Sequence, residues 1–290
     1  MVRPLVIWPL AGNTVSAMRT AVVTGASSGI GRATAVELAR RGLHVVAAGR
    51  SRSRTAPVVE AILAEGGSAE FASLDLSSLP ATREAGRALI GSGREIEILV
   101  NNAGVGLGRG VTEDGFEIHF GVNHLGHFLL TELLTPAMTD DARVVTVTSA
   151  AHYRASGIDF ERMVGRTRSL LGWREYGVSK LANVLFSREL AVRRPGLRTY
   201  AVHPGLVDTG IIPGWVKPFL QQRLLTPDEG ADPVVRCAIS PDLDGQTGLY
   251  YSRSAITSPS PVAEDDELAA ELWKRSTGWI GAGPVASGHR

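Results

Sequence analysis

The chain has 290 residues, 44% of them hydrophobic and 20% charged, which suits one or two globular domains with a substantial core. Its formal net charge of +1 gives no sign of the basic surface that nucleic acid or an acidic membrane would need. The single cysteine, Cys237, excludes an internal disulfide framework and is expected to be a small packing residue.

The N-terminal segment 1–17 is expected to be a poorly ordered extension. Pro4 and Pro9 interrupt its apolar stretch, and no span approaches the roughly 20 residues that cross a membrane. A signal peptide would also need a longer apolar stretch and a better cleavage site. Met18 directly precedes the first strand pattern and is a candidate start of the working protein. We therefore expect no membrane span and a cytoplasmic location.

Strand and helix patterns alternate along the rest of the chain. Apolar, β-branched runs predict strands that begin at Thr20 and continue at His44–Ala48, Ala69–Leu74, Glu97–Val100, Ala142–Thr148, Leu197–His203 and Gly248–Tyr251. Apolar residues at helical spacing predict helices at Arg32–Arg41, Pro57–Glu65, Ala81–Ile90, Glu113–Pro136 (one helix or two), Glu175–Arg194 and Ala263–Leu272. The alternation predicts one α/β domain at 18–280 and a flexible tail at 281–290. That domain would be a Rossmann-like, doubly wound parallel sheet of about seven strands with helices on both faces.

Sheets of this kind bind ligands outside the carboxyl ends of their strands, near the point where strand order reverses. The residues that directly follow the predicted strands should therefore line one edge. They are Gly25–Gly31, Arg50, Asp75, Asn101–Gly104, Ser149 and Pro204–Gly205.

The segment from Thr20 to Gly31 has the layout of a phosphate-binding turn. A short apolar run leads into Gly25, Gly29 and Gly31, and a helical pattern follows. Glycines let the backbone take positive φ and approach a ligand closely, while the free N–H groups at the helix start attract an anion. The spacing is G-x-x-x-G-x-G rather than the commoner G-x-G-x-x-G, and an ordinary turn is the alternative.

The same turn also fits the pattern G-x-S-x-G of serine hydrolases, with Ser27 as the nucleophile. Only about twenty residues precede it, whereas such a nucleophile elbow lies well into the sheet. An HGGG-type oxyanion loop is missing from the sequence as well. Both features weigh against the hydrolase interpretation.

Tyr176 and Lys180 are four residues apart in a predicted helix and share one face. A fixed ammonium beside a phenol stabilises the phenolate, so we expect a Tyr176 pKa below the usual value of about 10. Such a tyrosine suits acid–base chemistry near neutral pH. A surface pair at helical spacing is the alternative.

Two further polar residues occupy unusual places. Ser149 follows a buried strand pattern, where its hydroxyl could donate to a carbonyl oxygen or simply end the strand. Asn123 lies inside an apolar helical pattern, for which asparagine is a poor choice. A distorted helix or a water-binding role would explain Asn123, and a satisfied buried amide is the alternative.

Three histidines, His119, His124 and His127, are close in sequence. No spacing adds a carboxylate or a third ligand on one face, so we expect no metal site.

The order of these motifs resembles the short-chain dehydrogenase/reductase family over roughly residues 19–275. The resemblance rests on Thr24-Gly25-x-x-x-Gly29-x-Gly31, Asn101-Asn-Ala-Gly104, Asn123, Ser149, Tyr176-x-x-x-Lys180 and Pro204-Gly205. The segments Phe120–Leu130, Tyr176–Phe186 and His203–Thr209, with the long gap between Ser149 and Tyr176, look most like the retinol-dehydrogenase-like branch.

This resemblance implies a role for each residue. Tyr176 would be the general acid/base, Lys180 would bind the nicotinamide ribose and lower the tyrosine pKa, Ser149 would orient the substrate oxygen, and Asn123 would hold a water. Asp75 would face the adenine, and Val207 and Thr209 the nicotinamide. The implied cofactor-binding set is Gly25, Ser27, Ser28, Gly29, Ile30, Gly31, Arg50, Asp75, Leu76, Asn102, Ala103, Gly104, Tyr176, Lys180, Pro204, Val207 and Thr209.

The charge after the second predicted strand favours NADP(H) over NAD(H). An acidic residue there would hold a free ribose 2′-hydroxyl, but the chain has Arg50, and an arginine can hold a 2′-phosphate. Arg52 and Arg54 are expected to be solvated.

The sequence thus predicts an NADP(H)-dependent oxidoreductase that moves hydride to or from a carbonyl or alcohol carbon of an apolar small molecule. A mobile lid is expected at Val207–Leu225, and a second wall of the substrate site at Ala150–Arg174, with His152, Tyr153 and Trp173. A nucleotide-binding regulator of the same fold without turnover remains an alternative. No nucleic-acid partner is expected, and a homo-oligomer is left open.

Overall fold

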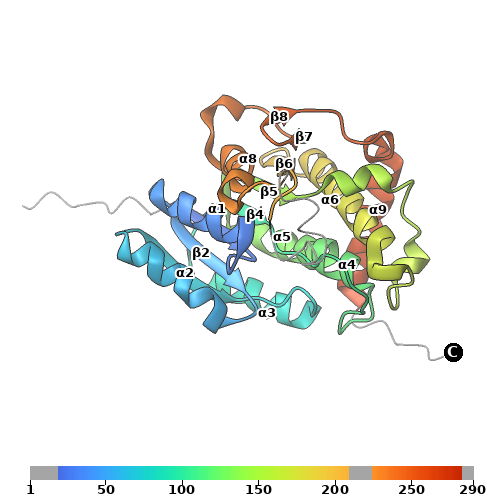
Figure 1. Cartoon of the computed structure of the whole chain (residues 1–290), viewed down its shortest axis with the longest axis horizontal. Coiled ribbons are helices and arrows are strands. Elements are labelled where there is room, and N and C mark those ends of the chain that lie inside the picture. The colour runs from blue at the N-terminus through green and yellow to red at the C-terminus, as the bar shows by residue number, and fades with distance from the viewer. Residues whose placement is uncertain (1–18, 209–223, 283–290) are drawn as a thin grey trace, which may run out of the picture.

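The computed structural model describes residues 19–208 and 224–282 of the chain (Figure 1). The predicted extension at 1–17, Thr209, nearly all of the predicted lid and most of the predicted tail lie outside the described residues.

Eight strands form one sheet in the order β3-β2-β1-β4-β5-β6-β7-β8. All neighbours pair in parallel except β7 and β8, which are antiparallel. This confirms the predicted doubly wound sheet of about seven strands, since the eighth is a two-residue edge strand. The bounds are β1 Thr20–Thr24, β2 His44–Gly49, β3 Ser68–Ser73, β4 Ile96–Asn101, β5 Met138–Val147, β6 Arg198–His203, β7 Leu249–Ser252 and β8 Ala255–Ile256.

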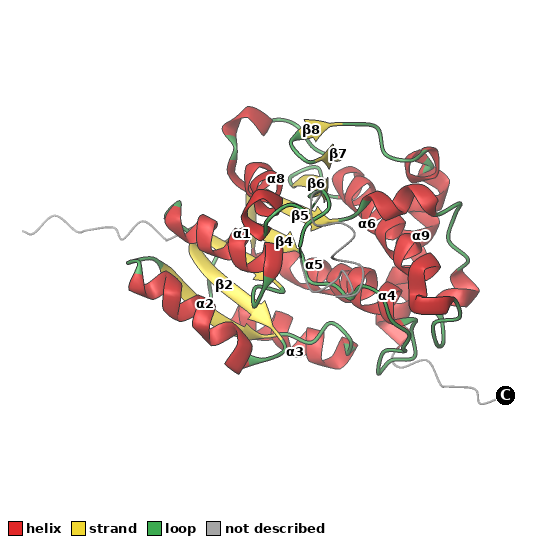
Figure 2. Ribbon diagram, viewed as in Figure 1, coloured by secondary structure: helices red, strands yellow, loops and turns green. Residues whose placement is uncertain are grey.

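Helices cover both faces of the sheet (Figures 1 and 2). Successive strand residues point to opposite faces, so Ala21 and Val23 pack with the first group of helices and Val22 with the second. The first group is α1 Gly29–Arg40, α2 Arg52–Ala64 and α8 Pro227–Ile239. The second group is α3 Leu79–Gly91, α4 Ile118–Phe120, α5 Gly126–Leu134, α6 Trp173–Arg193 and α9 Asp266–Ala282.

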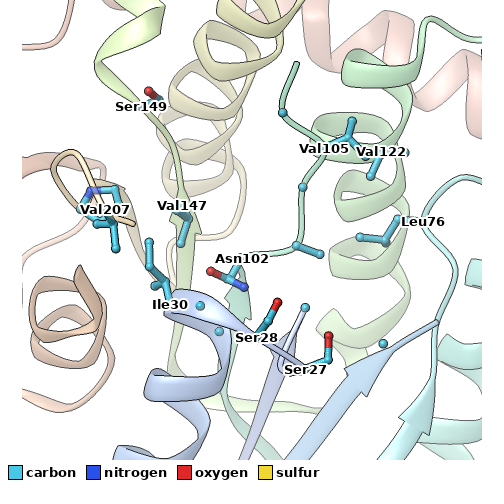
Figure 3. A pocket seen from close by; sticks show the side chains of 18 of the residues that line it. Ser27, Ser28, Ile30, Leu76, Asn102, Val105, Val122, Val147, Ser149 and Val207 are labelled. Carbon is cyan, nitrogen blue, oxygen red and sulfur yellow. The ribbon is translucent and has the colours of Figure 1, made fainter. Parts of the chain in front are cut away.

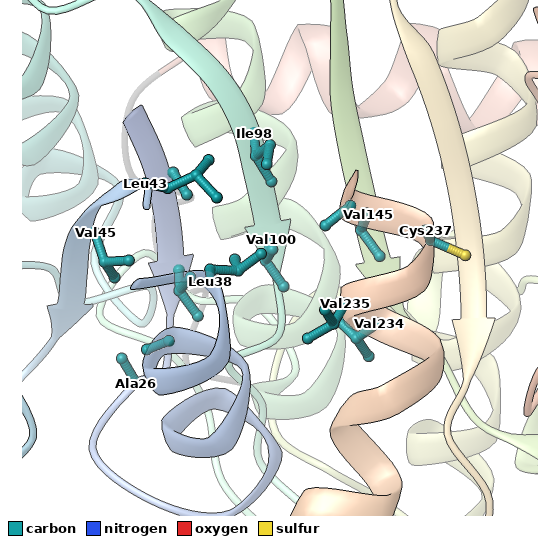
Figure 4. Packing of buried hydrophobic residues seen from close by; sticks show 14 of the residues in the cluster. Ala26, Leu38, Leu43, Val45, Ile98, Val100, Val145, Val234, Val235 and Cys237 are labelled. Atoms are coloured by element: carbon teal, nitrogen blue, oxygen red, sulfur yellow. The ribbon is translucent and has the colours of Figure 1, made fainter. Parts of the chain in front are cut away.

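Helix α8 was absent from the expected elements. Its start carries a capping box, in which Thr226 and Glu229 bond each other's backbone amides, and this T-x-x-E signal is readable in the sequence. The helix packs Val234, Val235 and the buried Cys237 against the sheet (Figure 4). Cys237 is therefore the packing residue that was expected.

The long predicted helix at Glu113–Pro136 is broken into three pieces. Between α4 and α5 lies one π-helical turn, Gly121–Leu125, which contains Asn123. The expected helix distortion at Asn123 is confirmed. Such π-turns are frequent at functional sites. A Cβ at Gly126 would be 2.7 Å from the Leu76 carbonyl oxygen, so only glycine lets this helix approach the loop after β3.

Candidate active site

A cavity of about 850 Å³ lies at the carboxyl edge of the sheet, where it was expected. Residues following β1, β2, β3, β4, β5 and β6 line it together with two residues of α6. Figure 3 shows Ser27 and Ser28 at the glycine turn and Ser149 on a separate segment of the wall. Of the predicted site residues that the structure describes, all but Asn123 line this cavity.

The glycine turn between β1 and α1 forms a tight cradle. Gly25 and Gly29 have φ of +69° and +55°, a conformation that favours glycine. A side chain at Gly31 would overlap the Asn102 amide nitrogen and the Gly25 carbonyl oxygen. The first turn of α1 faces the cavity, and its N-cap Ser28 makes no side-chain capping bond. The amides at this helix start can therefore bind an anion.

Thr24 ties this turn to the loop after β4. Its hydroxyl oxygen accepts hydrogen bonds from the amides of Asn102 and Ala103, both at 2.9 Å. The Asn102 side chain donates to the Thr24 carbonyl at 2.8 Å. The two loops that follow neighbouring strands are thus held together as one wall.

Basic residues line the cavity beside β2. Arg50 lies there as predicted, and Arg54 and Ser51 line the same end. The expectation that Arg54 is merely solvated is therefore incomplete, because the N-terminus of α2 begins at Arg52 rather than at Pro57 and turns Arg54 toward the cavity. Arg52 instead stacks over the Phe71 ring, with 4.7 Å between its guanidinium carbon and the ring centre.

Helix α6 presents Tyr176 and Lys180 to the cavity. Both side chains are buried, and the Lys180 ammonium lies 5.8 Å from the centre of the Tyr176 ring. Lys180 Nζ donates to the Val147 carbonyl at the end of β5 at 3.0 Å, while the Thr148 hydroxyl donates to the Lys180 carbonyl at 2.8 Å. These bonds hold α6 against the end of β5 and so bring Ser149 beside Tyr176.

Burial sets the charge states of this pair. It raises the pKa of Tyr176 above its usual value, and a hydrogen bond with the Ser149 side chain offsets part of that rise. Burial also lowers the pKa of Lys180 to about 8. The predicted lowering of the Tyr176 pKa is wrong for this structure, because loss of hydration outweighs the hydrogen bond from Ser149.

The Asn123 amide bonds the protein itself. Its oxygen accepts from the Val105 amide at 2.8 Å, and its nitrogen donates to the Val105 carbonyl at 3.1 Å and to Ser179 Oγ at 3.0 Å. The structure therefore shows a buried amide whose hydrogen bonds are satisfied, which was the alternative left open for Asn123 by the sequence. Asn123 holds the loop after β4 against α6, and its water-binding role stays a prediction.

The three neighbouring histidines point to different partners. His119 Nδ1 lies 2.8 Å from Glu117, His124 Nε2 3.0 Å from Ser276 Oγ, and His127 Nε2 2.9 Å from Thr24 Oγ1. Burial lowers the pKa of His124 to about 3 and that of His127 to about 4. Within residues 19–208 and 224–282, no three His, Cys, Asp or Glu side chains gather as metal ligands would.

The residues predicted to form a second wall of the substrate site lie elsewhere. His152, Tyr153 and Trp173 do not line the cavity. His152 turns back to its own surroundings, with Nδ1 2.8 Å from the Ser149 carbonyl oxygen and Nε2 accepting from the Ser260 amide at 3.1 Å. It fixes the segment that carries Ser149.

Sequence reasoning missed a further set of lining residues. Most of them flank predicted ones at strand ends, so a wider window after each strand would have included them, whereas Val122 lies in the π-turn beside Asn123. The set is Ala48, Gly49, Ser51, Arg54, Leu74, Val105, Gly106, Leu107, Val122, Val147, Thr148, His203 and Leu206.

Comparison with known proteins agrees with this geometry. A family model described as short chain dehydrogenase matches residues 19–217. The chain belongs to the short-chain dehydrogenase family. It is 41% identical to human dehydrogenase/reductase SDR family member 13 over 92% of this chain and 74% of that protein. It is 42% identical to mouse polyprenol dehydrogenase, over 97% and 88%, and 37% identical to human retinol dehydrogenase 13, over 91% and 85%.

Solved structures of this short-chain dehydrogenase fold are also similar. An uncharacterised protein from Mycobacterium paratuberculosis is 35% identical, with a TM-score of 0.77 over 93% of this chain and 96% of that one. A blue fluorescent protein from a metagenomic library, solved in complex with NADPH, is 26% identical, with a TM-score of 0.67 over 81% and 95%.

The cradle fits the nicotinamide cofactor of this family. The glycine turn can take the diphosphate, and the 850 Å³ cavity runs from there to Tyr176 and Lys180. The described ranges contain no helix that is both long and apolar enough to cross a membrane.

Proposed function

We propose that the protein is an NADP(H)-dependent oxidoreductase that interconverts a carbonyl compound and an alcohol, with Tyr176 as the general acid/base. One observation carries this proposal: Tyr176, Lys180 and Ser149 meet at the wall of the cavity that contains the glycine turn. A serine hydrolase that uses Ser27 is disfavoured by the family, since the same turn fits a dinucleotide diphosphate.

Ser149, Tyr176 and Lys180 would each have a separate role in the reaction. The bound nicotinamide would supply or accept the hydride. The Ser149 hydroxyl donates to the substrate oxygen and holds it near Tyr176 Oη, and the phenol gives that oxygen its proton during carbonyl reduction. Lys180 would bind the nicotinamide ribose. Its ammonium would also stabilise the negative charge of the phenolate that is left when Tyr176 has given up its proton. Because burial raises the Tyr176 pKa, the phenol is protonated at neutral pH and can act as the proton donor when a carbonyl is reduced.

The preference for NADP(H) rests on charge. Arg50 and Arg54 line the cavity end beside β2, where a 2′-phosphate would receive charge-assisted hydrogen bonds from either guanidinium. The NADPH complex of the similar blue fluorescent protein adds support by analogy. Predicted cofactor residues outside this end, including Asp75, Leu76, Pro204 and Val207, line the same cavity. Thr209 lies outside the described residues.

An apolar substrate is supported by two similar proteins whose names specify polyprenol and retinol, both alcohols with long hydrocarbon chains. The test is a screen of aldehydes, ketones, retinoids, polyprenals and steroids, in which NADPH and NADH absorbance is followed. We expect turnover with NADPH and an apolar carbonyl. Tight NADPH binding without turnover across the panel would instead support the regulator that lacks catalysis.

The remaining expectations are kept as proposals. They are one catalytic domain at 18–280, with segments 1–17 and 281–290 outside it, and a cytoplasmic location, while the question of a homo-oligomer stays open. Truncation, cell fractionation and sedimentation of the full chain test them separately.

A further inference from the structure

A group of large apolar side chains is exposed to solvent at the loop that leads into α6. Three of them come from this loop and one from the adjoining segment, which is joined to it by a hydrogen bond from the Gly110 amide to Thr167 Oγ1 at 3.0 Å. We call the group the apolar tip. Its members and their exposed fractions are Val111 46%, Leu170 81%, Leu171 41% and Trp173 50%. Single exposed apolar side chains are common on soluble proteins, but a group of them marks a contact surface.

The backbone of the tip is strained at Leu171. Its φ is +58°, a left-handed conformation that glycine adopts freely and leucine rarely does. The turn around it is nevertheless held in place, because the buried Glu175 carboxylate accepts from the amides of Arg168 at 3.2 Å and Ser169 at 3.0 Å. Strain of this kind is found at ligand contacts. The exposure of the leucines is therefore a built feature of the loop.

Positive charge accompanies the apolar tip. Residues 109–113 and 165–174 contain one carboxylate, Glu113, and four exposed arginines, namely Arg109, Arg166, Arg168 and Arg174. Glu175, the next residue along the chain, is buried and turned inward to Ser169, so it leaves this charge in place. The net charge of +1 for the whole chain thus conceals a local basic surface, which sequence reasoning missed.

This combination fits an anionic lipid surface better than a second copy of the chain. Leucine and tryptophan side chains enter the boundary between headgroups and acyl chains, and arginines are attracted to anionic headgroups. A twofold dimer through the same surface would bring the arginines of both copies together. A protruding tip also offers little of the roughly 800 Å² that each partner buries in a stable protein interface.

The apolar tip lies beside the cavity. Gly106 and Leu107 line the cavity, and the next amide along the chain, that of Gly108, donates to the Leu171 carbonyl at 2.9 Å. Trp173 lies in the first turn of α6, three residues before Tyr176. The tip therefore adjoins the rim of the cavity at the end that contains Tyr176.

We propose that the apolar tip and its arginines dock the protein on an anionic lipid surface, with the Tyr176 end of the cavity beside the lipid. Docking itself needs no chemistry at the cavity. Its consequence, that an apolar substrate dissolved in the lipid reaches Tyr176 directly, rests on the proposed function.

Three variants separate docking from folding. Leu170→Ser removes the most exposed side chain, and Arg168→Gln removes one charge. Leu171→Gly shortens the tip and also relieves the left-handed strain, so it should weaken docking without lowering the melting temperature. The matched controls are Val192→Ser, which is 76% exposed at the other end of α6, and Arg87→Gln, an exposed arginine on α3.

Binding of the full-length proteins to sedimented phosphatidylcholine vesicles is measured with and without about 30% phosphatidylserine. We expect wild-type binding to be at least about tenfold tighter with phosphatidylserine and to weaken as ionic strength rises. Leu170→Ser, Leu171→Gly and Arg168→Gln should each weaken it about fivefold or more, with melting temperatures no lower than that of the wild type. Both controls should stay within about twofold.

Tryptophan fluorescence shows which residue enters the lipid. Brominated phosphatidylcholine in the vesicles should quench the wild type more than Trp173→Phe, although both proteins bind. Equal quenching, no preference for phosphatidylserine, or weakening by Val192→Ser as strong as by Leu170→Ser would overturn the proposal. So would a lower melting temperature or the loss of a dimer in Leu170→Ser, because the tip would then be covered by protein.

Kinetics test the consequence of docking for the substrate. Leu170→Ser should raise the KM for a long-chain aldehyde dissolved in the vesicles and leave the KM for a short, water-soluble aldehyde unchanged. A wild type that binds NADPH but turns over no carbonyl would contradict the proposed function alone, since vesicle binding and quenching still decide whether the tip docks on lipid.

Discussion

The Lys180 ammonium lies 5.8 Å from the centre of the Tyr176 ring, one helical turn along α6. Despite this closeness, burial dominates both groups, raising the pKa of the phenol and lowering that of the ammonium to about 8. Burial therefore disfavours both the phenolate form of Tyr176 and the ammonium form of Lys180.

Tyr176→Phe should abolish turnover while leaving NADPH affinity unchanged. The ring still packs against its neighbours, but the transferable proton is gone, and such groups contribute about 10²–10⁴-fold to the rate. Steady-state kinetics and fluorescence titration with NADPH measure the two effects. A variant that keeps more than half of the wild-type rate would rule out Tyr176 as the acid/base.

Lys180→Met should stabilise the protein while removing activity. The Lys180 pKa falls from 10.5 to about 8 on folding, which corresponds to about 3 kcal/mol of unfavourable free energy at neutral pH. The Val147 carbonyl keeps a second donor, Asn183 Nδ2 at 3.2 Å, so no acceptor is orphaned. With about 1 kcal/mol lost from the Lys180 hydrogen bond, we expect a net gain of about 2 kcal/mol in urea unfolding at pH 7.

The pH dependence gives this prediction a sign. Between pH 10.5 and about 8, the unfolded chain binds a proton at Lys180 that the folded chain does not, so the wild type loses stability as the pH falls through this window. Below pH 8 the whole penalty is present. The advantage of Lys180→Met should thus be largest below pH 8 and shrink toward pH 10.5. A gap that is constant from pH 7 to 10 would contradict the burial argument.

Arg50→Asp should erase or reverse the preference for NADPH over NADH, chiefly through the KM for cofactor. A charge-assisted hydrogen bond is worth about 1.5–3 kcal/mol, and the exposure of Arg50 points to the low end, about tenfold. Arg54→Ala should weaken the preference less, because Arg50 remains. Arg52→Ala is the control, since that side chain stacks on Phe71 instead. The measurement is kcat/KM with NADPH and with NADH at two salt concentrations. Wild-type protein that prefers NADH would contradict the assignment of Arg50 to the 2′-phosphate.

Much of the fold could be predicted from the sequence. The alternating apolar runs located every parallel strand to within a few residues, and the rule that ligands bind after strand ends placed Gly25–Gly31, Arg50, Asp75, Ser149 and Pro204 at one cavity. These inferences succeed because they depend on local patterns and on the handedness of the connections, both of which are fixed by the chain itself.

The features that were missed depend on contacts between distant segments. The Tyr176 pKa is set by how much protein surrounds the ring, and a spacing of four residues says nothing about that. Arg54 reaches the cavity because Ser51 caps α2 and the helix begins at Arg52, five residues before the expected start. The Glu117–His119 pair depends on Gly106 and Thr167, which are brought together only by the folded loops.

Gly31→Ala should impair both folding and NADPH binding. A Cβ at Gly31 would overlap the Asn102 amide and the Gly25 carbonyl, so the turn that takes the diphosphate must open. We expect a loss of at least 2 kcal/mol in unfolding free energy, typical of overpacking, and at least tenfold weaker NADPH binding. Gly278→Ala is the matched control in α9, where a Cβ meets no atom within 4 Å, and it should stabilise by about 0.5–1 kcal/mol. Equal behaviour of the two variants would contradict the cradle.

The central claim, direct hydride transfer at the Tyr176 cavity, is tested most directly by isotope transfer. NADPH carrying deuterium at C4, in either the 4R or the 4S position, is incubated with the protein and the best apolar aldehyde from the screen, and the alcohol is analysed by mass spectrometry. We predict one deuterium on the carbinol carbon from one of the two labels with wild-type protein, and no labelled alcohol with Tyr176→Phe. Alcohol that contains no deuterium from either label, or equal labelled product from the Tyr176→Phe protein, would contradict it.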